Sequence, residues 1–293
     1  MKYAAIDIGT NAARLLIGEV VEQNNHTYVQ KISYTRVPLR LGFEVFNDGI
    51  ISETKVEQFT KTIKAFLILA DVYEVEGIRA CATSAMREAK NGKAVQKHIK
   101  KKTGLTIEII DGEAEAEIIF STFSILTAHE NTPFLVIDVG GGSTEVSVFE
   151  AGKKIAGKSF NIGTIRILKD KVQPNAWDEV DYWLKNSLDL SMPHKVFATG
   201  GNINKVHKIL NKGFMQPIKT REFKKIYNQL KKMSFEERID AYQLKPDRAD
   251  VIVPACSIYA FIIKRLGCKE MYVPKIGLSD GMIYEMYKNE VAN

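Results

Sequence analysis

The sequence predicts an α/β fold built from two similar halves, each a mixed sheet flanked by helices. Short apolar runs that end in glycine-containing turns alternate with amphipathic stretches of helical period. A turn of the same type occurs at Asp7–Thr10 and again at Asp138–Thr144. Each of the two turns belongs to a group of three strands joined by short turns, which indicates an internal duplication. The chain has 293 residues. Because a single core rarely grows beyond about 250–300 residues, we expect two domains.

In the first half we expect three strands, followed by helices and strands in alternation. Val56, Phe59 and Ile63 repeat at helical spacing after Ser52, a residue type that favours a helix start. A polar turn, Gln23–His26, separates the second strand from the third. The expected strands are Tyr3–Ile8, Ala13–Val21, Tyr28–Pro38, Gly77–Ala82 and Thr106–Ile110, and the expected helices are Ser52–Tyr73, Gly92–Lys102 and Glu113–Ala128.

The second half repeats this order from Pro133 onward. We expect strands at Phe134–Asp138 and up to Phe149, a hairpin at Ala151–Gly152, and a returning strand Lys153–Phe160. Helices follow, then a strand Lys195–Ala198, then further helices. The expected first domain covers residues 1–125 and the second 126–280, and the helix at 281–293 is expected to pack back on the first domain.

The composition indicates a cytoplasmic protein with anionic partners. The formal net charge is +6 and the sequence pI is about 9.0, although most charged residues are the ordinary solvated surface. Cys81, Cys256 and Cys268 have neither paired nor metal-ligand spacing, so we expect buried, reduced thiols. The N-terminal residues reach charge too early for a secretory signal, and Val251–Ile263 is too short to span a bilayer. Neither a membrane nor a nucleic acid is expected as a partner.

The two glycine turns predict phosphate binding. Glycine lets the backbone approach a ligand closely, and successive N–H groups in such a turn form a concavity for anions. A carboxylate at the end of a buried strand is unfavourable unless it is paired or bound to a metal, which makes Asp7 and Asp138 candidate Mg²⁺ ligands. The alternative is a pair of tight hairpin turns in which aspartate caps its own backbone. Three glycines at Gly140, Gly141 and Gly142 weigh against this alternative.

Four segments resemble the exopolyphosphatase/guanosine pentaphosphate phosphohydrolase family, a branch of the superfamily of actin, sugar kinases and heat-shock ATPases. They span nearly the whole chain in the family's order, and they are Asp7–Leu16, Ala82–Asn91, Asp138–Glu145 and Arg248–Pro254. The resemblance implies a duplicated actin-like (ribonuclease H-like) fold with two domains, mixed five-stranded sheets and a central cleft.

The resemblance also implies a catalytic set. Aligned on Gly112, the family's catalytic glutamate falls on Glu115, which we expect to be the general base. By itself, the acidic run of this segment is also typical of the first turn of a helix. Asp111, Ala114 and Glu117 depart from the family pattern, as do Asn202 and Ser279, and these departures leave the substrate preference open.

Metal and phosphate ligands complete the expected site. Asp138 and Glu145 are expected to bind Mg²⁺, or Mn²⁺ in its place, or to position water, and Asp7 is a further metal ligand. Arg14 and Arg87 are the expected phosphate clamps, because guanidinium matches phosphate oxygens bidentately. Arg166 stays open. The expected phosphate-binding residues are Gly9, Thr10, Asn11, Arg14, Thr83, Ser84, Arg87, Gly140, Gly141, Gly142, Ser143 and Thr144.

We expect an exopolyphosphatase that releases orthophosphate from the end of inorganic polyphosphate. Guanosine pentaphosphate is the second possible substrate, since both compounds present a triphosphate end. Two further functions stay open, namely a kinase or ATPase of the same fold and a non-catalytic polyphosphate or nucleotide sensor. Longer relatives carry a helical extension beyond the position of Asn293, so short chains are the expected preference. A homodimer stays open.

Overall fold

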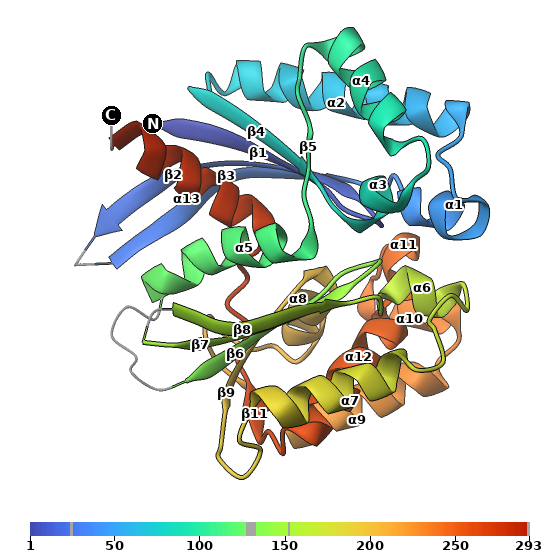
Figure 1. Ribbon diagram of the computed structural model, residues 1–293, viewed down its shortest axis with the longest axis vertical. Coiled ribbons are helices and arrows are strands. Elements are labelled where there is room, and N and C mark those ends of the chain that lie inside the picture. The colour runs from blue at the N-terminus through green and yellow to red at the C-terminus, as the bar shows by residue number, and fades with distance from the viewer. Residues whose placement is uncertain (24–25, 127–132, 152, 292–293) are drawn as a thin grey trace. The chain divides into compact units, whose positions relative to one another are not determined.

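The computed structural model describes residues 1–23, 26–126, 133–151 and 153–291 (Figure 1). The chain divides into two compact units, called unit 1 (Met1–His129 with Ile276–Asn293) and unit 2 (Glu130–Lys275). Within the described ranges, no helix is both long and apolar enough to cross a bilayer. Parts of four predicted elements, residues 24–25, 127–128, 152 and 292–293, lie outside the described residues.

Unit 1 is built on a five-stranded mixed sheet in the order β3-β2-β1-β4-β5. Strand β2 is antiparallel to β1 and β3, whereas β4 runs parallel to β1 and β5 runs parallel to β4. Six of the seven residues of β1 are buried, as expected for a central strand with both faces covered. The strands are β1 Lys2–Ile8, β2 Ala13–Gln23, β3 His26–Val37, β4 Gly77–Ala82 and β5 Glu108–Ile109.

Helices cover both faces of this sheet, with α2 and α4 on one face and α5 and α13 on the other (Figure 1). Helix α2 begins where predicted, because the Ser52 side chain accepts a hydrogen bond from the Lys55 N–H. Its apolar face buries Phe59, Ile63 and Phe66. The helices of unit 1 are α1 Leu41–Asp48, α2 Glu53–Val72, α3 Ser84–Glu88, α4 Gly92–Thr103, α5 Gly112–Leu126 and α13 Leu278–Val291.

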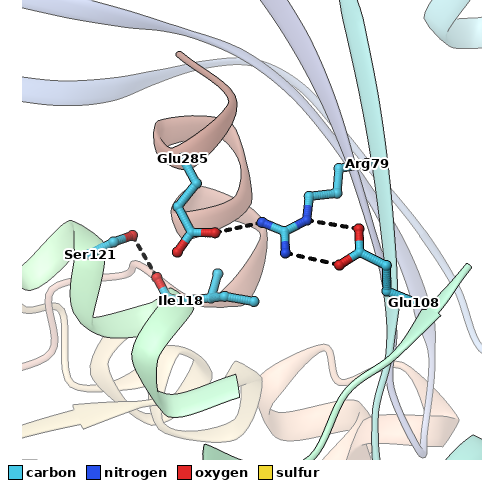
Figure 2. A network of polar contacts seen from close by, with 5 residues as sticks. All are labelled: Arg79, Glu108, Ile118, Ser121 and Glu285. Atoms are coloured by element: carbon cyan, nitrogen blue, oxygen red, sulfur yellow. Dashed lines mark hydrogen bonds and ion pairs between the residues drawn. The ribbon is translucent and has the colours of Figure 1, made fainter. Parts of the chain in front are cut away.

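Helix α13 is anchored to the sheet of unit 1 by ion pairs. Figure 2 shows Arg79 of β4 between two carboxylates, with its Nη1 2.5 Å from Glu285 of α13 and its Nε 3.0 Å from Glu108 of β5. Near the first residue of α13, Lys31 of β3 lies 2.8 Å from the buried carboxylate of Asp280. Ion pairs therefore connect two strands, β4 and β3, to a helix that is distant from them in sequence.

Unit 2 repeats the mixed sheet in the order β8-β7-β6-β9. Strand β7 is antiparallel to β6 and β8, and β9 is parallel to β6. Five strands were expected in this sheet, and the described residues form four. Beside β9 there is also an isolated parallel bridge between Phe197 and Tyr272. Pro274 follows two residues after Tyr272 and has no N–H with which to extend a ladder. The strands are β6 Phe134–Val139, β7 Thr144–Glu150, β8 Lys153–Phe160, β9 Lys195–Thr199, β10 Ile218–Lys219 and β11 Glu270–Met271.

Helix α12 supplies much of the core of unit 2. Cys256, Tyr259 and Ile262 are buried along it, and Pro254 is tolerated because it lies in the first turn, where its missing N–H has no intrahelical partner. The helices of unit 2 are α6 Thr164–Leu168, α7 Ala176–Ser187, α8 Gly201–Ile209, α9 Thr220–Lys232, α10 Phe235–Tyr242, α11 Pro246–Ala249 and α12 Ile252–Arg265.

The structure differs from the sequence expectations in short elements. Helices α1 and α3 were not predicted, and β5 is only two residues long instead of Thr106–Ile110. Helix α1 starts at Arg40, whose backbone is left-handed (φ 54°) and whose side chain makes no cap hydrogen bond. Without a cap residue or a long apolar period, no local pattern marked this helix.

Candidate active site

The two glycine turns have the same backbone geometry. In unit 1, the Gly9 N–H donates to the Ala12 carbonyl at 3.0 Å, and in unit 2 the Gly140 N–H donates to the Ser143 carbonyl at 3.0 Å. Each turn follows an aspartate by two residues and joins two antiparallel strands. The duplication predicted from the sequence is therefore present at the level of single hydrogen bonds.

Neighbouring helix starts hold the carbonyl groups of both turns. Thr10 and Asn11 accept from the N–H groups of Gly42 and Arg40 at 3.0 and 2.9 Å. At the equivalent positions of unit 2, the Gly141 carbonyl accepts from the Ile165 N–H at 2.8 Å, and the Gly142 carbonyl accepts from Arg166 Nε at 2.5 Å. Each turn is therefore held through its carbonyl groups.

The N–H groups of the unit 2 turn are available to a ligand. Among the described residues, the backbone N–H groups of Gly141, Gly142 and Ser143 have no hydrogen-bond acceptor. Gly163 lets helix α6 approach this closely, because a Cβ on it would lie well under 3.0 Å from the Gly141 backbone. Three free N–H groups in one turn form an anion-binding concavity.

In unit 1, the Thr10 hydroxyl is also available to a ligand. Thr10 is 2% exposed, and its Oγ1 has no hydrogen-bond partner within the described part of the chain. A buried hydroxyl without a partner is unfavourable, so this atom is suited to a phosphate oxygen.

Unit 2 places four polar side chains in one row across its sheet. Thr199, Asp138, Glu145 and Ser159 are register partners in β9, β6, β7 and β8. Thr199 Oγ1 donates to Asp138 Oδ1 at 2.6 Å, and Ser159 Oγ donates to Glu145 Oε1 at 2.7 Å. Carboxylate oxygens of Asp138 and Glu145 lie within 4.8 Å of each other. The row is a pair of carboxylates supported by a hydroxyl on each side.

The equivalent row of unit 1 carries a different charge pattern. Its members are Cys81, Asp7, Arg14 and Arg36. Arg14 Nη1 donates to Asp7 Oδ2 at 2.5 Å, so the aspartate already has a positive partner. The role of Asp7 as a metal ligand stays a prediction. The ion pair with Arg14 already gives the buried carboxylate a positive partner, which the prediction had expected a metal to provide.

The remaining unit 1 candidates gather at one edge of the sheet. Ile8, Ala82 and Ile109 are aligned at the carboxyl ends of β1, β4 and β5, and the glycine turn, α3 and α5 follow them directly. In open α/β sheets this edge is where ligands bind. The Thr83 N–H donates to the Ile8 carbonyl at 3.1 Å, which ties the α3 segment to the turn.

Two of these candidates have protein partners. Arg87 Nη1 donates to the Ile110 carbonyl at 2.7 Å, which holds the guanidinium beside the start of α5. The Ser84 hydroxyl donates to Glu88 Oε1 at 2.8 Å and can therefore meet a phosphate only as an acceptor or after rotating. Arg87 thus keeps more donors for a phosphate than Ser84 does.

Glu115 lies in the first turn of α5 and is half-buried, whereas Glu113 and Glu117 are exposed. Asp111 caps this helix, since the Ala114 N–H donates to Asp111 Oδ1 at 2.9 Å. The residue at this departure from the family pattern therefore caps the helix that carries Glu115.

Sequence reasoning missed the supporting residues of this site. Thr199, Ser159 and Arg40 were not among the expected site residues. Tyr259 donates its hydroxyl to the Thr199 carbonyl, and burial raises the pKa of this phenol well above its ordinary value. Alternation in β8 was the available signal for Ser159, but the register that places it opposite Glu145 is not readable from one strand.

The Asn202 departure and the nearby glycines have structural explanations. Arg248 Nη1 donates to Asn202 Oδ1 at 3.1 Å, so the asparagine binds a protein partner. A Cβ on Gly201 would lie 2.6 Å from Arg248 Nη1, and Gly200 has a φ of 109°. Close packing and backbone conformation therefore account for both glycines.

Comparison with known proteins identifies similar chains. Residues 19–181, more than half of the chain, match the model of the Ppx/GppA phosphatase family. A bifunctional 3-dehydroquinate synthase/phosphatase of Fusobacterium nucleatum is 36% identical over 56% of this chain and 25% of its own length. A guanosine-5′-triphosphate,3′-diphosphate pyrophosphatase of Photobacterium profundum is 26% identical over 97% of this chain and 59% of its own. Exopolyphosphatase 1 of Mycobacterium tuberculosis is 30% identical over 50% of this chain and 42% of its own length.

Solved structures share the fold. The Aquifex aeolicus member of the Ppx/GppA family superposes with a TM-score of 0.78 at 24% identity, covering 99% of this chain and 98% of its own. An exopolyphosphatase from Cytophaga hutchinsonii gives 0.83 at 23% identity with the same coverage. These likenesses establish the two-domain actin-like architecture. The chain spans less than two thirds of the length of the curated relatives described above.

Proposed function

Because the chain belongs to the Ppx/GppA phosphatase family, we propose that it hydrolyses the terminal phosphoanhydride of inorganic polyphosphate and releases orthophosphate. A cytoplasmic location is part of the proposal. The observation that carries it is the unit 2 turn, whose three free N–H groups lie in the chain between Asp138 and Glu145, the two members of the carboxylate pair. An anion-binding turn beside two carboxylates suits a phosphate chain that arrives with a divalent cation.

The carboxylate pair fits Mg²⁺. Asp138 and Glu145 each have one oxygen held by a hydroxyl, which orients the carboxylates, and carboxylate oxygens are the ligands that a hard cation prefers. Neither of their register neighbours, Thr199 and Ser159, carries a positive charge. Bound there, Mg²⁺ would supply positive charge that stabilises phosphate oxygens during hydrolysis.

We assign the general base to Glu115. In the proposed reaction, a water oxygen attacks the terminal phosphorus while Glu115 accepts the water proton, and the bond from phosphorus to the bridging oxygen breaks. The electron pair of that bond stays on the shortened chain. Orthophosphate and a polyphosphate one unit shorter are the products.

We assign the phosphate oxygens to the two turns and to arginine. The N–H groups of the unit 2 turn and the Thr10 hydroxyl would donate to them. Arg87, fixed by the Ile110 carbonyl, keeps further N–H donors for the same purpose. Arg14 stays part of the proposal, with one nitrogen engaged by Asp7.

Guanosine pentaphosphate is the second candidate substrate. The relative from Photobacterium profundum, whose name specifies that substrate, matches nearly the whole chain. The chemistry at the terminal phosphate is the same for both compounds. A preference for short polyphosphate chains and a homodimer stay predictions.

Phosphate release tests the proposal. Tripolyphosphate, a long polyphosphate and guanosine pentaphosphate are compared side by side with Mg²⁺, using the wild type, Glu115→Gln and the neighbouring Glu113→Gln. We expect release from at least one compound, a loss of about 10²–10⁴-fold in kcat for Glu115→Gln, and little change for Glu113→Gln. Tight binding of all three compounds without release would instead indicate a non-catalytic sensor. Wild-type turnover by Glu115→Gln would refute the base assignment.

A further inference from the structure

Helix α13 meets helix α5 at a contact that only glycine can make. A Cβ on Gly281 of α13 would lie well under 3.0 Å from the carbonyl oxygen of Ile118 and 2.8 Å from its Cγ2. Cβ atoms essentially never come within 3.0 Å of such atoms, so the two backbones would have to separate. Gly281 and Ile118 are both buried, which leaves no solvent side to which either could move freely.

This contact lies one helical turn from Glu115. Glu115 and Ile118 are three residues apart on α5, and residues at this spacing are neighbours on a helix surface. A helix moves as a rigid rod over so short a distance, because each turn is closed by backbone hydrogen bonds. Any displacement of the Ile118 backbone is therefore passed to the Glu115 carboxylate.

The other side of the contact is fixed. Arg79 binds Glu285 of α13, and Lys31 binds the buried Asp280, the residue directly before Gly281 (Figure 2 shows the Arg79 pair with Ile118 nearby). Both ion pairs connect α13 to strands of the central sheet. A side chain added at Gly281 would therefore displace α5 rather than α13.

We propose that Gly281 is a positioning residue for Glu115: by bringing the two backbones into contact, it sets the height of α5 above the sheet and so the place of the base. The proposal rests on the proposed function of Glu115. Displacement of a catalytic group by about 1 Å can reduce a rate by about 100-fold without any contact between the mutated residue and the substrate.

The test compares two glycine-to-alanine variants from the same segment. Gly281→Ala adds a methyl group at the contact, whereas Gly277→Ala adds it where nothing lies within 4 Å, and the Gly277 φ is not in the left-handed region. With tripolyphosphate and Mg²⁺, we expect Gly281→Ala to lower kcat by about 100-fold while KM changes less than about threefold. Gly277→Ala should match the wild type. Hydrogen exchange of amides 112–122 should speed up in Gly281→Ala alone.

A double-mutant cycle shows whether Gly281 acts through Glu115. If it does, Gly281→Ala causes no further loss of kcat in a Glu115→Gln background, because the group it displaces is already gone. A full additional loss there, or a wild-type kcat for the single variant, would overturn the proposal. Normal turnover by Glu115→Gln alone would instead count against the proposed function, and with it against any positioning of that base.

A second variant covers a failure of Gly281→Ala to fold. Arg79→Met releases Glu285 and adds no atom between α13 and α5. We expect a smaller fall in kcat, of about three- to tenfold, that also disappears in the Glu115→Gln background. An Arg79→Met enzyme with wild-type kcat and unchanged amide exchange in α5 would contradict the proposal.

Discussion

Asp138 and Glu145 lie directly opposite each other on β6 and β7, with carboxylate oxygens within 4.8 Å. The equivalent pair in unit 1 is Asp7 and Arg14, an ion pair on β1 and β2. The same position of the duplicated sheet is thus balanced in charge in unit 1 and carries two acidic groups in unit 2. Because of this difference, we expect the Asp138–Glu145 pair to be the main ligand of the divalent cation in the proposed function.

Removing one carboxylate of the pair should weaken metal binding. We expect Glu145→Gln to lower the affinity for Mg²⁺ at least about tenfold, because a neutral amide is a poorer ligand for a hard cation. Glu150→Gln, which changes an exposed carboxylate at the end of the same strand, is the matched control and should leave that affinity unchanged. Isothermal titration of Mg²⁺ without substrate measures both. An equal loss in the two variants would place the cation elsewhere.

The hydroxyl of Thr199 should support the metal ligand next to it. Thr199→Val removes the hydrogen bond to Asp138 Oδ1 and keeps the shape of the side chain. We expect a fall of about 10–100-fold in Mg²⁺ affinity, the usual effect of removing a group that orients a metal ligand. Thr199→Ser should restore binding, because it restores the donor. If serine and valine behave alike, the hydroxyl has no such role.

The Asp111 cap should contribute to stability. Asp111→Ala leaves the Ala114 N–H without its partner, and we expect the free energy of unfolding to fall by about 1 kcal/mol. Asp111→Ser should stay close to the wild type, since serine is an equally good cap. Urea denaturation followed by circular dichroism distinguishes the two variants. A serine variant as unstable as the alanine one would mean that the charge, not the cap, matters.

The Arg79 network should stabilise unit 1 modestly. Arg79 is 24% exposed and binds Glu108 with two nitrogens and Glu285 with one. We expect Arg79→Met to lower the free energy of unfolding by about 1–2 kcal/mol, and less at high salt. Lys185→Met breaks a more exposed ion pair with Asp181 and should have a smaller effect. Equal effects in denaturant titrations would show that the partly buried network is no stronger than a surface pair.

His207 should make unit 2 sensitive to acid. Burial lowers its pKa in the folded state, Nε2 is 3.0 Å from the Gln216 carbonyl, and Nδ1 has no partner among the described residues. The unfolded chain therefore binds this proton more readily, so the stability contribution is present above about pH 6.5 and is lost as the pH falls below it.

Both tryptophans, Trp177 and Trp183, lie in unit 2, so their fluorescence follows the unfolding of that unit. In urea titrations at about pH 7.5 and about pH 5.5, on either side of the ordinary histidine pKa, we expect His207→Gln to reduce the loss of stability between the two values. His98→Gln, at an exposed position on α4 of unit 1, is followed by circular dichroism in the same titrations and should leave the loss unchanged. If His207→Gln loses as much stability between the two pH values as the wild type, groups other than His207 cause the loss.

The sequence was sufficient for elements that local patterns determine. The strands around both turns and the start of α2 at Ser52 follow from apolar runs and a cap residue, which act over a few neighbours. Helix α1 was out of reach, because its start at Arg40 is fixed by hydrogen bonds to the Asn11 and Thr10 carbonyls and not by its own residues.

The rows across the sheets were also out of reach. Arg14 was expected to bind phosphate and Asp7 to bind metal, but register places them opposite each other. Ser159 and Thr199 acquire a role only because strands far apart in sequence bring them beside Glu145 and Asp138. Register depends on how whole strands pair, and one sequence does not determine it when several apolar alternations are compatible.

The return of α13 to unit 1 has a consequence for synthesis on the ribosome. Residues 276–293 complete a unit that begins at Met1, so the whole of unit 2 is translated before unit 1 has all its parts. Until α13 has been synthesised, the sheet face that it covers stays exposed in the nascent chain. Exposed apolar residues on that face favour association with other chains. All of unit 2 is therefore available to fold before the last helix of unit 1 has been made.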